Sequence, residues 1–165
     1  MKAQDVAIPE PAVPTLHVQK VLVPIDFSTP CNKAFKYALG FARQFGSQII
    51  MIHVIEPAAG VDAEPLAVEG TPRTQSEGAL AEEKMQALAE ASRDGSFHIT
   101  SGIRRGVATH EIVQAAAELD VDLIIMATHG LRGWKHFGLG STADRVARAA
   151  PCPVLVVRER EREFI

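Results

Sequence analysis

A glycine-rich segment, residues 127–142, has the composition of a site that binds an anion. It reads ATHGLRGWKHFGLGST and lies between an apolar run and a segment with helical spacing. Glycine permits positive φ angles and lets backbone amides approach a phosphate with no Cβ in the way. A helix that begins at Ser141 would also direct its free amides and the positive end of its dipole to the same place. The segment therefore predicts a binding site for phosphate.

The charges around this segment favour the same kind of ligand. The formal net charge of the chain is −3, which gives no general attraction to nucleic acid or to an anionic membrane. Residues 127–150 nevertheless contain four cationic side chains and a single acid, namely Arg132, Lys135, Arg145 and Arg148 with Asp144. This local excess of positive charge suits a polyphosphate.

Two common nucleotide-binding patterns do not fit the segment, and a third does. A Walker-type GxxxxGK[ST] loop needs lysine where the chain has Leu139. Gly138 begins a GxGxxA pattern, but that dinucleotide fingerprint follows a strand directly, whereas Gly138 lies eleven positions after Ala127. In the third pattern Gly130 is followed by nine residues and then by Gly140 and a hydroxyl residue that opens a helix.

Five apolar runs, separated by segments of helical spacing, are the elements that must position this site. The predicted strands cover residues 21–25, 49–55, 97–103, 123–127 and 153–157. Four of the runs are nearly continuous in aliphatic residues, which is typical of strands buried on both faces. The run at 97–103 is more polar, so we expect it at an edge of the sheet.

The first two helices are expected between the first three strands. Thr29 can cap the first helix, Pro30 can take its first position, and Gly46 can end it. The second helix lies within residues 77–93. The stretch before it, residues 56–74, has no periodicity and is long for a connection, so it is a candidate flap.

The other two helices complete an alternating βαβαβαβαβ order. The third is expected to end near Leu119, and the fourth to begin with a capping box of Ser141 and Asp144 and to end at Pro151. This order predicts an α/β fold, a five-stranded parallel sheet with helices on both faces. Ligands of such sheets bind beyond the carboxyl ends of the strands.

The two ends of the chain and its cysteines indicate the remaining organisation. We expect a flexible N-terminal arm over residues 1–17, one domain over 18–158 and a charged tail over 159–165, because no apolar run has the length of a signal peptide or a membrane span. Cys31 and Cys152 belong to no metal-ligand cluster or disulfide framework. Reduced thiols, and so a cytoplasmic protein, are the expected state.

These segments, in this order, resemble those of the universal stress protein family. The resemblance runs from about Lys20 to Val157 through KVLVPIDFS, IIMIHVIEP, ELDVDLIIMATHG, GLGSTADRVAR and APCPVLVV. It implies a Rossmann-like domain of the adenine nucleotide alpha hydrolase-like type, usually a homodimer. Some members of the family bind ATP and others do not.

The resemblance also implies which residues hold an adenine nucleotide. The residues expected at the nucleotide are Pro24, Asp26, Val54, Ala127, Gly130, Gly133, Gly140, Ser141 and Thr142. Asp26 would lie against ribose and adenine, the backbone of Val54 would hold adenine, and the glycines with Ser141 would hold the phosphates. The family commonly has glycine in place of Ala127, whose methyl group would stand close to a phosphate.

Other interpretations of these residues stay open. Ser141 can serve as a helix cap only, Asp26 as a turn-forming residue only, and Gly133 as a residue of a turn without ligand contact. His53, inside an apolar strand, is expected to be a hydrogen-bonded core histidine.

The function expected from these observations is ATP binding by a regulatory protein of the stress response. Mg²⁺ can accompany the phosphates without protein ligands of its own. The sequence offers no catalytic residue and no metal cluster, so any ATP hydrolysis would be slow. A nucleotide-free, dimeric interaction protein of the same fold and a slow ATP-hydrolysing enzyme are the alternatives. We expect a homodimer through the last strand and neither nucleic acid nor membrane as a partner.

Overall fold

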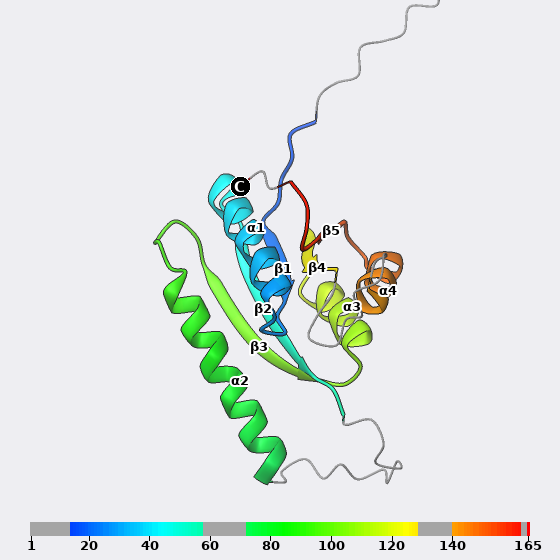
Figure 1. The fold of residues 1–165 in the computed structure, drawn as a ribbon. Coiled ribbons are helices and arrows are strands. Elements are labelled where there is room, and N and C mark those ends of the chain that lie inside the picture. Colours follow the sequence, from blue (N-terminus) through cyan, green and yellow to red (C-terminus); the bar gives the residue numbers. More distant parts are fainter. Residues whose placement is uncertain (1–13, 58–71, 129–139, 163–164) are drawn as a thin grey trace, which may run out of the picture.

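Five parallel strands form a single sheet in the computed structural model, which describes residues 14–57, 72–128, 140–162 and 165 (Figure 1). The strand order is β3-β2-β1-β4-β5. The strands are β1 (Lys20–Pro24), β2 (Gln48–Ile55), β3 (Ile99–Arg105), β4 (Leu123–Ala127) and β5 (Val154–Val157). The expected α/β class with a parallel sheet is confirmed, and β3 lies at an edge as its polar sequence predicts.

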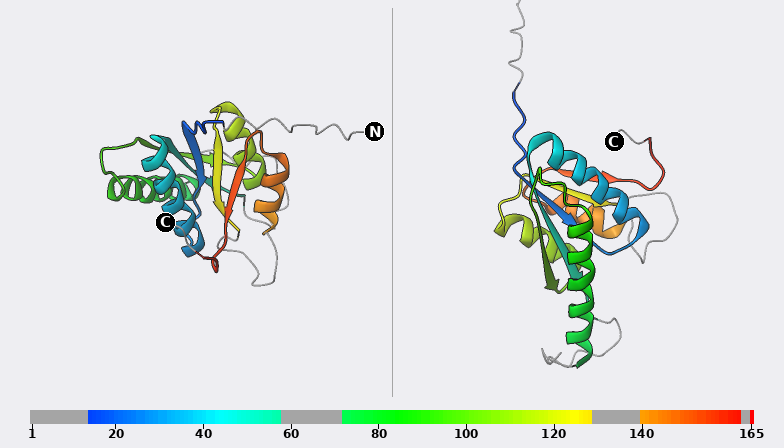
Figure 2. Two further views of the ribbon diagram at one scale, coloured as in Figure 1. Left: turned by 90° about the horizontal axis from the view of Figure 1, so that it is seen from above. Right: turned by 90° about the vertical axis from the view of Figure 1, so that its left-hand side faces the viewer.

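Four helices among the described residues cover the two faces of this sheet. They are α1 (Thr29–Phe45), α2 (Pro72–Ala91), α3 (Ala108–Glu118) and α4 (Ser141–Ala149). Because neighbouring residues of a strand point to opposite faces, β1 contributes to two cores. Val21 and Val23 pack with α1 and α2, while Leu22 packs with α3 and α4. Figures 1 and 2 show α3 beside α4 and the first half of α2 projecting from the rest of the molecule.

The start of α1 differs by one residue from the prediction. Ser28, not Thr29, is the N-cap, and its hydroxyl accepts a hydrogen bond from the amide of Cys31 at 3.3 Å. Ser28 is buried, whereas Thr29 is exposed. At the other end, Gly46 takes the left-handed conformation with φ of 70° and closes the helix, as expected.

Three further boundaries differ from the prediction. The third strand begins at Ile99, two residues later than expected, and continues to Arg105. The second helix begins at Pro72, so residues 72–74 of the predicted irregular stretch are helical. The fourth helix has Gly140 as its N-cap with no side-chain hydrogen bond, so the predicted capping box is not formed. Asp144 instead accepts from Nε of Arg148, with 3.1 Å to each carboxylate oxygen.

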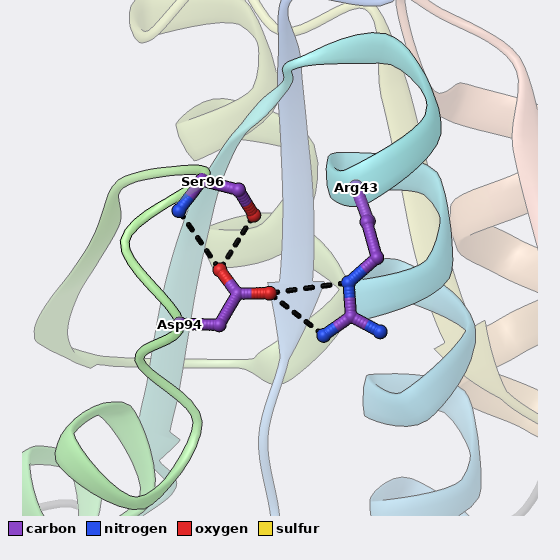
Figure 3. A network of polar contacts seen from close by, with 3 residues as sticks. All are labelled: Arg43, Asp94 and Ser96. Carbon is purple, nitrogen blue, oxygen red and sulfur yellow. Dashed lines mark hydrogen bonds and ion pairs between the residues drawn. The ribbon is translucent and has the colours of Figure 1, made fainter.

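A polar network near the amino ends of β2 and β3 holds the α2–β3 connection against α1 (Figure 3). Arg43 donates to Oδ2 of Asp94 through Nη2 at 2.7 Å and Nε at 3.1 Å. Oδ1 of Asp94 accepts from the amide and the hydroxyl of Ser96 at 2.9 and 2.5 Å. The hydrogen bond from the Ser96 hydroxyl is the largest cause that lowers the pKa of Asp94 to about 2, and Arg43 adds to it.

The segment after β5 returns along α1. Nζ of Lys33 donates to the carbonyl oxygens of Arg158 and Glu159 at 3.0 and 3.2 Å and lies 4.0 Å from the carboxylate of Glu161. Part of the predicted C-terminal tail is therefore held by the first helix. Most of the predicted N-terminal arm lies outside the described residues.

Candidate functional site: a cleft at the carboxyl ends of the strands

The strand order reverses between β1 and β4, and a cleft lies at the carboxyl ends of the strands there. Its volume is about 690 Å³, and the carboxyl ends at such a reversal are the usual ligand site of doubly wound sheets. The cleft is lined by residues from β1, β2 and β4, from the helices α1, α2, α3 and α4, and from the turns before α1 and α3.

Seven of the nine residues expected at the nucleotide line this cleft. They are Pro24, Asp26, Val54, Ala127, Gly140, Ser141 and Thr142. Gly130 and Gly133 lie outside the described residues. Residues more than one hundred positions apart in the chain therefore meet in one concave site, while their contact with a ligand stays a prediction.

Two hydrogen bonds of Thr128 fix the ends of the glycine-rich segment. The amide of Thr128 donates to the carbonyl oxygen of Val157 at 3.0 Å, and its own carbonyl accepts from the amide of Gly140 at 3.0 Å. The last residue before α4 is thereby held beside the end of β4. Thr128 is buried and lines the cleft, although the sequence analysis did not single it out.

The N-terminus of α4 opens on the cleft without a side-chain cap. The amide of Asp144 donates to the carbonyl oxygen of Gly140 at 2.9 Å and makes the first bond of the helix. The three amides before it have no partner inside the helix, and Gly140 has no side chain to satisfy them. Ser141 and Thr142 both lie on the cleft wall. This arrangement favours an anion at the start of α4.

Asp26 forms the turn between β1 and α1 and also lines the cleft. Its Oδ1 accepts from the amide of Ser28 at 3.0 Å and from the Ser28 hydroxyl at 2.6 Å. The interpretation of Asp26 as a turn-forming residue is therefore correct. Because the half-buried carboxylate also lines the cleft, the role in ribose binding stays compatible with this geometry.

Phe27 and His53 form an aromatic pair on the same wall. Their ring centroids are 4.9 Å apart, and Nζ of Lys84, on α2, lies 5.4 Å from the centroid of Phe27. Nδ1 of His53 lies 2.6 Å from the carbonyl oxygen of Ile25. Since a carbonyl only accepts, Nδ1 carries the proton, and in the neutral ring Nε2 is an acceptor. The predicted hydrogen bond is therefore confirmed, but His53 is half-buried and lines the cleft instead of lying in the core.

Phe27 adopts a backbone conformation that non-glycine residues rarely take. Its φ is 62°, a conformation that for a bulky residue costs on the order of 1–3 kcal/mol and often occurs at ligand sites. Nothing in the sequence beyond its place next to Asp26 indicates this. Phe27 and Lys84 are cleft residues that the sequence analysis missed, because their proximity depends on how α2 packs.

Glu56 joins the end of β2 to the start of α3. Its Oε1 accepts from the amide of Ala108 at 2.9 Å, where the N-cap residue Val107 provides no side-chain bond. Just before it, Gly106 donates its amide to the carbonyl oxygen of Ile55 at 3.1 Å and has a φ of 147°. A Cβ at Gly106 would stand 2.7 Å from Oε1 of Glu111, so the Glu111 side chain would have to move, and the positive φ would strain any other residue there.

The thiol of Cys31 lies at the cleft but is not a nucleophile. Burial raises its pKa to about 12, and its Sγ lies 3.4 Å from the carbonyl oxygen of Pro24. Both cysteines are free, as expected.

No three His, Cys, Asp or Glu side chains in the described part of the chain are grouped so that they could hold a metal ion. No helix among the described residues is long and apolar enough to cross a membrane.

Comparisons with known proteins agree with this fold. The model of the universal stress protein family matches residues 17–158. Universal stress protein MJ0531 of Methanocaldococcus jannaschii is 33% identical over 147 residues, covering 88% of this chain and 85% of that protein. The solved structure of MJ0577, from the same organism, is 29% identical with a TM-score of 0.77, covering 89% of this chain and 100% of that chain.

A third comparison concerns fold alone. The universal stress protein from Archaeoglobus fulgidus in complex with dAMP is 19% identical with a TM-score of 0.57, covering 87% of this chain and 99% of that chain. The α/β fold, the place of the cleft and the match over nearly the whole chain lead to one conclusion. The chain belongs to the universal stress protein family.

Proposed function

We propose that this protein binds an adenine nucleotide, ATP, in the cleft and acts as a regulatory protein of the stress response. The observation that carries the proposal is the uncapped N-terminus of α4, which opens on the same cleft as Asp26 and Val54. One end of the site thus suits phosphate, and the other offers a carboxylate and apolar strand residues for a nucleoside.

The dimensions and lining of the cleft fit such a ligand. Its volume of about 690 Å³ lies in the range of about 300–1,000 Å³ that is usual for small-molecule sites. Ile52, Ile112 and Met126 give it apolar walls, which suit the faces of a purine base. Asp26 can accept from ribose hydroxyls, and the amides that begin α4 with the Ser141 hydroxyl can donate to phosphate oxygens.

Binding, without fast turnover, is the activity that this site supports. The cleft thiol is neutral because of its raised pKa, and the acids and histidine of the described residues form no metal-holding group. Mg²⁺, where present, would be held by the phosphates of the ligand. The free thiols Cys31 and Cys152 support a cytoplasmic location as part of the proposal.

The nucleotide-free dimeric protein is the second candidate, and Ala127 is the observation that favours it. Its methyl group is on the cleft wall where the family commonly has glycine. The substitution Ala127→Gly distinguishes the two candidates. Tighter ATP binding would show that the methyl group obstructs the ligand, and unchanged tight binding would show that it does not.

Mass spectrometry of small molecules released from the denatured, purified protein tests the leading proposal directly. Calorimetry with ATP then tests the location of the site through Gly140→Val. The φ of −59° at Gly140 is open to any residue, so the variant should fold, but a branched side chain would stand over the amides that begin α4. We expect an affinity for ATP lower by about tenfold or more, which corresponds to about 1.4 kcal/mol. Equal affinities in variant and parent would contradict the assignment.

A further inference from the structure

Two arginines of α4 carry the same charge but lie in different surroundings. Arg148 is paired, since its Nε lies 3.1 Å from each carboxylate oxygen of Asp144, and it does not line the cleft. The hydrogen bond that Arg148 donates to Asp144 is the main cause that raises the pKa of Arg148. Arg145 lines the cleft and makes no hydrogen bond or ion pair with any described residue. Its charge is therefore available to a ligand.

The position of Arg145 on the helix directs this charge to the phosphate end of the site. Arg145 follows Ser141 by four residues, so the two lie on one face of α4. Long side chains on a helix lean toward its N-terminus, which here is the end that opens on the cleft. The other cation on the described wall, Lys84, lies on α2 above the ring of Phe27.

We propose that Arg145 is the residue by which the cleft selects nucleoside di- and triphosphates over monophosphates and nucleosides. This inference rests on the proposed function and names the ligand class of the same site. The three free amides of a helix N-terminus can hold one phosphate group. A second and third phosphate add negative charge that needs a further donor, and a guanidinium offers two parallel hydrogen bonds to phosphate oxygens.

Calorimetry on the full-length protein with adenosine, AMP, ADP and ATP tests the selection. The variants are Arg145→Gln, Arg145→Lys and the matched control Arg148→Gln, measured at about 0.15 M salt, where exposed charges more than about 8 Å apart are screened. We expect Arg145→Gln to lower the affinity for ADP and ATP by about tenfold, and that for AMP and adenosine by less than about twofold. The affinities of Arg145→Lys for ADP and ATP should lie between those of the parent and of Arg145→Gln, because lysine keeps the charge and loses the paired donors.

The control separates this role from a general effect of charge. Arg148→Gln should change none of the four affinities by more than about twofold, because its charge is already compensated by Asp144 and lies off the cleft. Equal losses of ATP affinity in the two Gln variants would overturn the inference, and so would an equal loss for all four ligands in Arg145→Gln. If the parent binds ATP and Arg145→Gln binds it with the same affinity, the inference about Arg145 is overturned while the proposed function stands. A parent that binds none of the four overturns the proposed function itself.

Discussion

Asp26 belongs both to the turn that begins α1 and to the wall of the cleft. Its Oδ1 accepts two hydrogen bonds from Ser28, and its side chain also lines the cleft. Asp26 is predictable as a candidate from its place after the first strand. Which of the two roles it has is not predictable from the sequence, because that depends on which side chains surround the carboxylate after folding.

The substitution Asp26→Ala should weaken binding of adenosine and of ATP by the same factor, because it removes an acceptor for the ribose. Binding of inorganic triphosphate, which has no ribose, should be unchanged. Isothermal titration calorimetry with the three ligands measures this. The control is Ser28→Ala, which loses the hydroxyl bond to Asp26 and the cap of α1 but keeps the amide bond and the carboxylate. A loss of nucleotide affinity as large in Ser28→Ala as in Asp26→Ala would assign the effect to the turn.

Among the secondary-structure elements, the strands were predictable because strands buried on both faces appear in the sequence as nearly continuous apolar runs. The run LIIMA became β4 with the predicted bounds, Leu123–Ala127, and four of its five residues are buried. Helix starts were less certain, because Ser28 and Thr29 both have capping hydroxyls and only the folded turn selects Ser28. The first residues of α2 were missed because PRTQSEG shows no apolar periodicity. The cap that Glu56 gives α3 joins residues 52 positions apart and leaves no local signal.

The network that joins α1 to the α2–β3 connection makes a prediction about pH. Folding lowers the pKa of Asp94 from 3.8 to about 2, so its ionised form is favoured in the folded state. Its contribution to stability is therefore fully present above about pH 4 and is lost as the pH falls to about 2. The gap in free energy of unfolding between the parent and Asp94→Asn should narrow over that interval. Urea unfolding at pH 6, 4, 3 and 2 measures it.

Arg43→Gln provides the companion measurement. It removes one of the causes of the lowered pKa but keeps both hydrogen bonds from Ser96. The pKa of Asp94 should therefore be lowered less in this variant. Its loss of stability between about pH 4 and pH 2 should be smaller than that of the parent. A gap between the parent and Asp94→Asn that is constant from pH 6 to pH 2 would show that the carboxylate has the same pKa in the folded and unfolded states.

For the whole molecule, the open edge at β5 is the feature that bears on assembly. The carbonyl oxygens of Pro153 and Val157 accept from amides of β4 and the residue after it. Successive residues of a strand turn their backbone groups to opposite sides, so those of Val154 and Val156 face the open edge. An apolar edge strand with unpaired backbone groups favours association. We propose a homodimer in which two copies of β5 pair antiparallel about a two-fold axis.

Val156→Pro is the substitution that tests this dimer most directly. It removes an outward amide, so it should break the pairing between subunits while the bonds of β5 to β4 remain. Val156→Lys is less suitable, because the Val156 side chain packs with the α3 and α4 core. Leu155→Pro is the matched control, since it removes an inward amide and should destabilise the fold. Sedimentation equilibrium at tens of micromolar decides, and a monomeric parent would contradict the proposal.

Thr128 connects the strand of the proposed dimer to the proposed nucleotide site through two hydrogen bonds. Its amide is bonded to Val157 at the end of the edge strand, and its carbonyl to Gly140 at the start of α4. A shift of Thr128 would therefore alter its hydrogen bonds both to Val157 and to Gly140. Thermodynamic reciprocity then fixes the relation between ligand and assembly. By whatever factor ATP strengthens the dimer, dimer formation strengthens the binding of ATP, and the apparent affinity becomes a function of protein concentration.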